Sequence, residues 1–77
     1  MKAQIAFSPS FSYFFYPSKE EMTPLNFPLQ RLTSVKDGVE ALGVPHSEMG
    51  EILVNGISVD FNYLLKDRDK ACILPFS

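Results

Sequence analysis

Few residues in this sequence could carry out chemistry, because it holds one cysteine, Cys72, and one histidine, His46. No histidine lies near Cys72 in the sequence to activate it as a nucleophile, so we expect a small strand residue there. A metal site needs several ligands, and the segment "VPHSE" around His46 offers no His/Cys cluster. Ser47 followed by Glu48 is more typical of a local cap at a turn than of a nucleophile and its base. We therefore predict no catalytic residue, no metal site and no cofactor, and hence a protein that is not an enzyme.

The charges and apolar segments favour neither nucleic acid nor membrane as a partner. The formal net charge is -2, and the seven lysines and arginines are spread along the chain with acids among them, unlike a surface that follows phosphates. The stretch "AFSPSFSYFFYP" is interrupted by serine and proline and is shorter than the roughly 20 residues of a membrane span. "MKAQIAF" lacks the apolar core and cleavage site of a signal peptide. We expect a cytoplasmic protein.

The aromatic residues of the segment 11 to 16 leave two interpretations open. Their rings could stack on the bases of a single-stranded nucleic acid. Alternatively, they could close one end of the core, because a long loop in a small domain must be held by large side chains. The absence of basic residues among them favours the second interpretation. The residues are Phe11, Tyr13, Phe14, Phe15 and Tyr16.

The first half of the chain predicts two strands. With 77 residues, 45% of them hydrophobic, the chain is expected to form one domain over residues 1 to 77. Residues 2 to 7 alternate, with Ala3, Ile5 and Phe7 on one face, which indicates a half-buried strand. Residues 25 to 30 alternate as well, and Pro28 cannot donate a ladder hydrogen bond, so this strand should lie at a sheet edge. Between them we expect helical turns near 11 to 16 and an exposed loop "SKEE".

The segment "SVKDGVEALGVP" predicts a helix with both of its ends defined. Ser34 is a natural N-cap, and Asp37 three residues later can return the hydrogen bond as in a capping box. Val35, Val39 and Leu42 form one apolar stripe. The glycine at position 43 can take the left-handed conformation that ends a helix, and the proline at 45 prevents its continuation.

The second half predicts a hairpin and a final strand. The dipeptide Asn55-Gly56 between apolar runs is the strongest short hairpin signal, because a type I' turn needs positive φ at both residues. Pairing across such a turn puts Leu53 and Ser58 on one face. "DFNYLL" should form an irregular connection, "KDRD" a turn, and "KACILPF" the last strand, with Ala71 and Ile73 inward. The opposite face of the hairpin holds Ile52, Val54, Ile57 and Val59.

This order of elements predicts an α+β protein. Two strands precede one helix, and a hairpin and a last strand follow it, which fits a mixed sheet of four to five strands with one main helix packed across one face. We expect the ubiquitin-like β-grasp fold.

The stretches "VKDGVEALGVPHSE", "ILVNG" and "VDFNYLLKDRDK" resemble the ubiquitin-like domains of the MoaD and ThiS sulfur-carrier superfamily. They are most similar to the ubiquitin-like domain that precedes Mut-seven C-terminal (PIN-like) ribonuclease domains in bacterial proteins. These stretches cover a little over half of the chain, whereas residues 1 to 31 match only in layout. The resemblance implies a β-grasp module, possibly the N-terminal domain of an RNA-processing protein.

Two departures from these families bear on function. Sulfur carriers end in Gly-Gly, whose carboxylate is adenylated and thiolated, whereas this sequence ends Leu74-Pro75-Phe76-Ser77. The alternative function, a sulfur carrier of thiamine or molybdopterin biosynthesis, is therefore disfavoured. In the second departure, Arg68 stands where the turn of these families commonly reads Asp-Gly-Asp. If this position requires a positive φ, arginine is unfavourable there.

One face of the predicted sheet is the candidate site. If Ala71 and Ile73 point inward, the alternate residues of the last strand point to the face opposite the helix, where Leu53 also lies. Ubiquitin-like domains commonly bind partners there, and a contiguous apolar patch calls for an explanation that a single exposed leucine does not. We therefore predict a non-enzymatic interaction module that binds a protein partner or an adjacent domain through Leu53, Cys72, Leu74 and Phe76.

Overall fold

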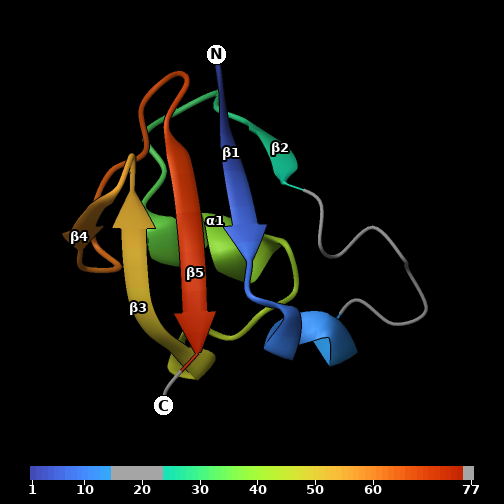
Figure 1. Cartoon of the computed structure of the whole chain (residues 1–77). Helices are drawn as coiled ribbons and strands as arrows, with labels where there is room; N and C mark the ends of the chain where they lie inside the picture. The colour runs from blue at the N-terminus through green and yellow to red at the C-terminus, as the bar shows by residue number, and fades with distance from the viewer. Residues whose placement is uncertain (15–23, 76–77) are drawn as a thin grey trace.

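The computed structural model describes residues 1–14 and 24–75, without the side chains of residues 12–14. It contains five strands, one α-helix and two short 3-10 helices (Figure 1). The sheet has the order β2-β1-β5-β3-β4, in which β1 and β5 are parallel and the other neighbours are antiparallel. This mixed sheet with one helix confirms the predicted β-grasp fold. The elements are β1 (Lys2–Phe7), η1 (Pro9–Phe14), β2 (Leu25–Pro28), α1 (Val35–Ala41), η2 (His46–Glu48), β3 (Met49–Val54), β4 (Ile57–Val59) and β5 (Lys70–Pro75).

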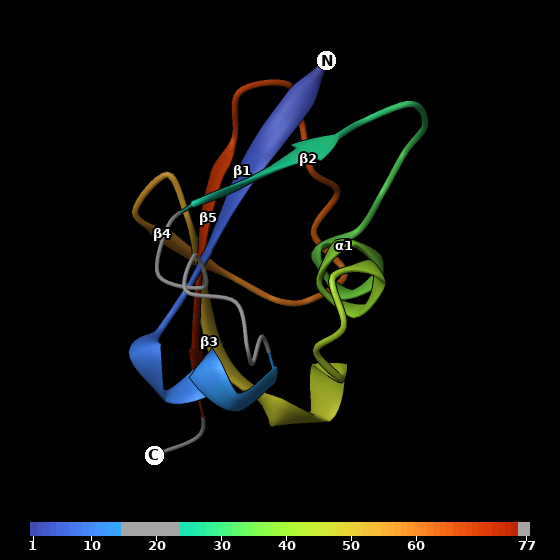
Figure 2. The ribbon, with the colours of Figure 1, turned by 90° about the vertical axis from the view of Figure 1, so that its right-hand side faces the viewer.

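The core lies between α1 and one face of the sheet, which Figure 2 shows edge-on with α1 on one side. The predicted inward residues of β1 and β5 are buried, because alternation along each strand turns every second side chain toward the helix. The apolar stripe of α1 covers them through Val35 and Val39, with Leu42 half-buried beside them. The fully buried side chains with the largest volumes are those of Ile5, Ile73, Val35, Val39 and Val44.

Both ends of α1 are capped. The N–H of Asp37 donates to Ser34 Oγ at 3.1 Å, which is the first of the two bonds of the predicted capping box. At the other end, Gly43 has φ 99°, and the N–H groups of Gly43 and Val44 donate to the carbonyls of Glu40 and Val39. This pattern is a Schellman motif, as the glycine predicts.

The irregular connection after β4 completes the N-terminal cap of α1. The first helical N–H groups, of Val35 and Lys36, donate to the carbonyls of Tyr63 and Phe61 at 2.8 and 2.9 Å. The N–H of Leu65 in turn donates to the carbonyl of Thr33 at 2.8 Å. The first four N–H groups of a helix lack acceptors within it, and this segment supplies carbonyl acceptors for two of them.

The segment after β1 forms the 3-10 helix η1, which begins two residues before the predicted helical turns at 11 to 16, and residues 15 and 16 of this prediction lie outside the described residues. Phe11 is buried, and its ring meets that of Phe7 edge-on, with 5.6 Å between the centroids. The described part of the aromatic segment therefore closes one end of the core, as the second interpretation requires. The loop "SKEE" and the side chains of the other aromatic residues lie outside the described residues. Strand β2 lies at the sheet edge as Pro28 predicts, although it ends at residue 28 rather than 30.

Strand β3 contains a bulge that its sequence pattern did not indicate. Its register against β5 shifts between Met49 and Glu51, so Gly50 is the extra residue. Such an insertion changes which residues face the core on either side of it. Met49 and Ile52 are both buried, although three positions separate them, and Glu51 is turned away from the core.

The predicted hairpin is confirmed at the predicted residues. Asn55 and Gly56 have φ 54° and 84°, and Val54 pairs with Ile57 across the turn. The same-face grouping is also confirmed by this register. However, the side chain of Ile57 is 68% exposed, because β4 is a short edge strand and α1, with seven residues, covers the central strands.

The turn before β5 places a non-glycine residue in the left-handed region. Arg68 has φ 70°, and its side chain is 91% exposed, with Nε 4.0 Å from Asp67 Oδ2. The position thus has a backbone conformation that glycine would adopt without strain.

We expect Arg68→Gly to raise the free energy of unfolding by about 0.5 to 1 kcal/mol, because relief of the left-handed strain exceeds the entropy that glycine adds to the unfolded chain. Urea unfolding of the variant measures this change. Arg68→Ala is the control, since it removes the same side chain but keeps the Cβ atom that causes the strain. Equal stabilisation by alanine and glycine would show that the side chain, and not φ, destabilises the turn.

Candidate interaction surface

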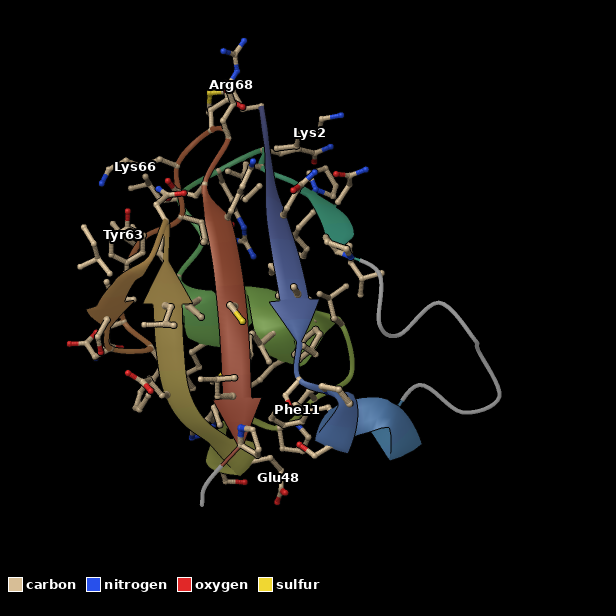
Figure 3. All side chains as sticks on the ribbon, in the orientation of Figure 1. Lys2, Phe11, Glu48, Tyr63, Lys66 and Arg68 are labelled. Atoms are coloured by element: carbon tan, nitrogen blue, oxygen red, sulfur yellow. The ribbon has the colours of Figure 1, made fainter. Side chains whose placement is uncertain are left out.

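The face of the sheet opposite α1 carries the predicted site residues Leu53, Cys72 and Leu74. This open face is turned toward the viewer in Figures 1 and 3, with α1 behind it. The strand register aligns Ala6, Cys72 and Leu53 side by side across β1, β5 and β3. Leu74 follows Cys72 on the same side of β5 and lies opposite Glu51 of β3. The structure therefore brings three of the four predicted residues together, while Phe76 lies outside the described residues.

The side chains of this group are partly exposed. Ala6, Leu53, Cys72 and Leu74 are all half-buried, unlike the inward residues of the same strands. We call these four residues the sheet-face patch. Ala6 is an addition to the predicted set, and the alternation that placed Ile5 inward was the signal that could have found it. Ser58 borders the patch on β4.

A buried carboxylate holds the strands of this face in register. Asp69 is 6% exposed and accepts hydrogen bonds from Asn55 Nδ2 at 2.9 Å, the Tyr63 hydroxyl at 3.1 Å and the Lys66 N–H at 2.8 Å. Its backbone carbonyl accepts from the N–H of Gln4 in β1 at 2.8 Å. Asp69 thus ties the hairpin, the connection and β1 to the start of β5. The sequence analysis treated it only as part of a turn.

Asn55 has a second role besides its turn conformation. Its N–H donates to the carbonyl of Lys70 at 2.9 Å, and its Oδ1 accepts from the N–H of Lys70 at 3.0 Å. The tip of the β3–β4 hairpin is therefore fixed against the first residue of β5.

The fold gathers basic residues that are separated in the sequence. The N–H of Arg68 donates to the carbonyl of Lys2 at 2.7 Å, and Lys70 pairs with Gln4, two residues after Lys2. Lys66 lies nearby, with its ammonium 4.9 Å from the centroid of the Tyr63 ring. Figure 3 shows Lys2, Lys66 and Arg68 at one end of the sheet and Glu48 at the other. The fold therefore brings Lys2 to the basic residues around the start of β5, where Asp67 and the buried Asp69 also lie.

The residues first considered for chemistry do not meet. His46 Nδ1–H donates to Glu40 Oε2, and its ring stacks at a tilt on Phe61, 5.6 Å between centroids. Cys72 is a free thiol on the open face. Among residues 1–14 and 24–75, no three His, Cys, Asp or Glu side chains are grouped to hold a metal ion. The hydrogen bond from His46 lowers the pKa of Glu40 below its ordinary value.

Comparison with known proteins identifies the family. A sequence model described as Mut7-C ubiquitin matches residues 1–77. The chain belongs to the Mut7-C ubiquitin family. Searches of curated proteins and of solved structures found no match. The family confirms the resemblance drawn from the helix, hairpin and turn segments, and with the five-stranded sheet it establishes a ubiquitin-like module.

This Mut7-C ubiquitin domain also has a hollow away from the open face. A cavity of about 420 Å³ lies between β2 and α1. Its walls combine the Phe27 ring with the opposite charges of Arg31 and Asp37, completed by Pro28, Gln30, Thr33 and Ala41. No helix within the described part of the chain has the length and hydropathy of a membrane span.

Proposed function

We propose that this domain is a non-enzymatic module that binds a protein surface through the sheet-face patch. The observation that carries the proposal is the alignment of Ala6, Cys72 and Leu53 across three adjacent strands, extended by Leu74. The helix packs against the opposite face of the sheet, so it does not cover these four side chains. A contiguous apolar patch of this kind is typical of a protein-binding surface.

The chemistry of the same face supports binding over catalysis. Cys72 is the one cysteine of the sequence, and among the described residues His46 hydrogen-bonds Glu40 and not Cys72. The sulfur-carrier alternative gains no support from the described residues, because Leu74 and Pro75 are paired with β3 and do not form a tail. A free thiol agrees with the expected cytoplasmic location.

A Mut7-C domain is the first partner to test, in the same polypeptide or in another. The name of the family, Mut7-C ubiquitin, supports this choice. The module would then be part of an RNA-processing protein and would place or regulate the other domain without itself touching RNA.

We expect Leu53→Asp and Leu74→Asp each to abolish binding of a purified Mut7-C domain while the fold is retained. A carboxylate in the centre of an apolar interface would be desolvated without a partner, at a cost of several kcal/mol. Two-dimensional amide NMR of the labelled domain measures binding, and the resonances of Ala6, Leu53, Cys72 and Leu74 should shift on titration. Thermal unfolding confirms that the variants are folded.

The matched control is Leu32→Asp, which makes the same change at a leucine that is 79% exposed and lies between β2 and α1. This control should bind like the unmodified domain. Resonance shifts concentrated at Phe27 and Arg31 would show instead that the partner binds at the cavity beside β2. A Mut7-C domain that produces no shifts would contradict the choice of partner.

A further inference from the structure

The sheet-face patch has a positively charged border at one end. Lys2 and Lys70 lie on the open face, because they alternate with the buried residues Ala3 and Ala71. Lys70 is two residues before Cys72, which places their Cα atoms about 7 Å apart along β5. Both lysine side chains are exposed, and no carboxylate within residues 1–14 and 24–75 forms an ion pair with either ammonium.

The other end of the patch has the opposite charge. Glu51 is exposed on the open face and lies directly opposite Leu74 in the ladder. Glu51 alternates with the buried Ile52, which turns it to the open face, whereas the bulge at Gly50 allows Met49 to be buried. The apolar residues therefore lie between two ammonium groups and a carboxylate, and a partner can satisfy these charges in only one orientation.

We infer that the partner surface combines apolar side chains with carboxylates that face Lys2 and Lys70, an inference that rests on the proposed function. Oppositely charged rims accelerate association and select the partner, whereas like charges brought together at the rim oppose it. Arg68 lies next to Lys2 at the same end, where its Nε is 4.0 Å from Asp67 Oδ2, so the inference rests on Lys2 and Lys70. A phosphate backbone fits less well, because its charges would continue across the apolar centre toward Glu51.

The experiment uses a random peptide library displayed on phage, selected on the immobilised domain. Peptides that also bind the double variant Leu53→Asp/Leu74→Asp are removed. Selected peptides are synthesised and titrated against the domain by calorimetry. A second titration uses a fluorescent oligouridylate as the nucleic-acid probe.

We expect the selected peptides to combine leucine or aromatic residues with aspartate or glutamate. Their affinity should fall about tenfold or more for Lys2→Glu/Lys70→Glu, and this loss should shrink at high salt. The matched control Arg31→Glu/Lys36→Glu changes the net charge equally but at positions in the β2–α1 segment and α1. It should change the affinity less than twofold, and circular dichroism verifies the fold of each variant.

The outcomes separate this inference from the proposed function. Selected peptides without acidic residues, or an equal loss of affinity in both charge variants, would overturn the inference and leave the sheet-face patch as the binding site. Failure to select any peptide that distinguishes the domain from its double-leucine variant would overturn the patch itself. Oligouridylate binding that requires the lysines but not Leu53 and Leu74 would assign the positive end to RNA and also overturn the inference.

Discussion

A chain that ends at Lys70 is expected to lose its cooperative unfolding transition. The truncation removes all of β5 beyond its first residue, and β5 is the strand that pairs with both β1 and β3. Burial of one large aliphatic side chain contributes about 1.5 to 3 kcal/mol, and Ile73 is fully buried. The added loss of Ala71 and of two hydrogen-bonded ladders exceeds the margin of a domain whose stability lies near the low end of about 5 to 15 kcal/mol.

Urea denaturation followed by far-UV circular dichroism measures this effect. The control chain ends at Pro75, which removes only residues 76 and 77 and leaves every described residue of β5 in place. It should unfold cooperatively. A sigmoidal transition in the shorter chain as well would mean that β1 and β3 can form a sheet without the strand between them.

Asp69→Ala is expected to lower the free energy of unfolding by about 3 kcal/mol, because it leaves three partly buried donors without their acceptor. The donors are Asn55 Nδ2, the Tyr63 hydroxyl and the Lys66 N–H. Asp69→Asn should cost less, about 1 to 2 kcal/mol, since its amide keeps one acceptor oxygen but turns an NH₂ group toward donors. Urea midpoints of the three proteins give this order.

Asp67→Ala is the matched control on the same turn. Asp67 accepts a hydrogen bond from the N–H of Lys2 at 3.0 Å in an exposed position, so its loss should cost less than about 1 kcal/mol. If Asp69→Ala and Asp67→Ala were equally destabilising, burial of the Asp69 carboxylate would not account for its importance.

Local patterns were sufficient for most of the fold. Alternation placed Ala3, Ile5 and Phe7 inward, Ser34 and Gly43 marked the ends of the helix, and Asn55-Gly56 fixed the hairpin register. Each of these signals acts between residues a few positions apart, where backbone conformation and side-chain periodicity decide the outcome. The same alternation put Leu53, Cys72 and Leu74 on one face.

The features that the sequence did not reveal depend on distant contacts. Asp69 is buried, unlike Asp67, and it accepts hydrogen bonds from the side chains of Asn55 and Tyr63, whereas a charged residue in a turn is ordinarily solvated. The positively charged border of the sheet-face patch forms because β1 and β5 are neighbours, which brings Lys2 beside Arg68. The bulge at Gly50 has no signal of its own in the pattern of apolar residues, since a glycine fits a strand, a turn or a bulge.

The parallel pairing of β1 and β5 also determines how the domain responds to mechanical load. Because both strands run from the Lys2 end of the sheet toward the Pro75 end, a pull on these two residues acts along the strands, across the direction of their hydrogen bonds (Figure 1). The hydrogen bonds from residue 4 to residue 7 then bear the load together and must shear at once. A pull that separates β3 from β4 would instead open their ladder one bond at a time from the free end. Joined at both ends to other domains, the module would act as a stiff connector that resists extension.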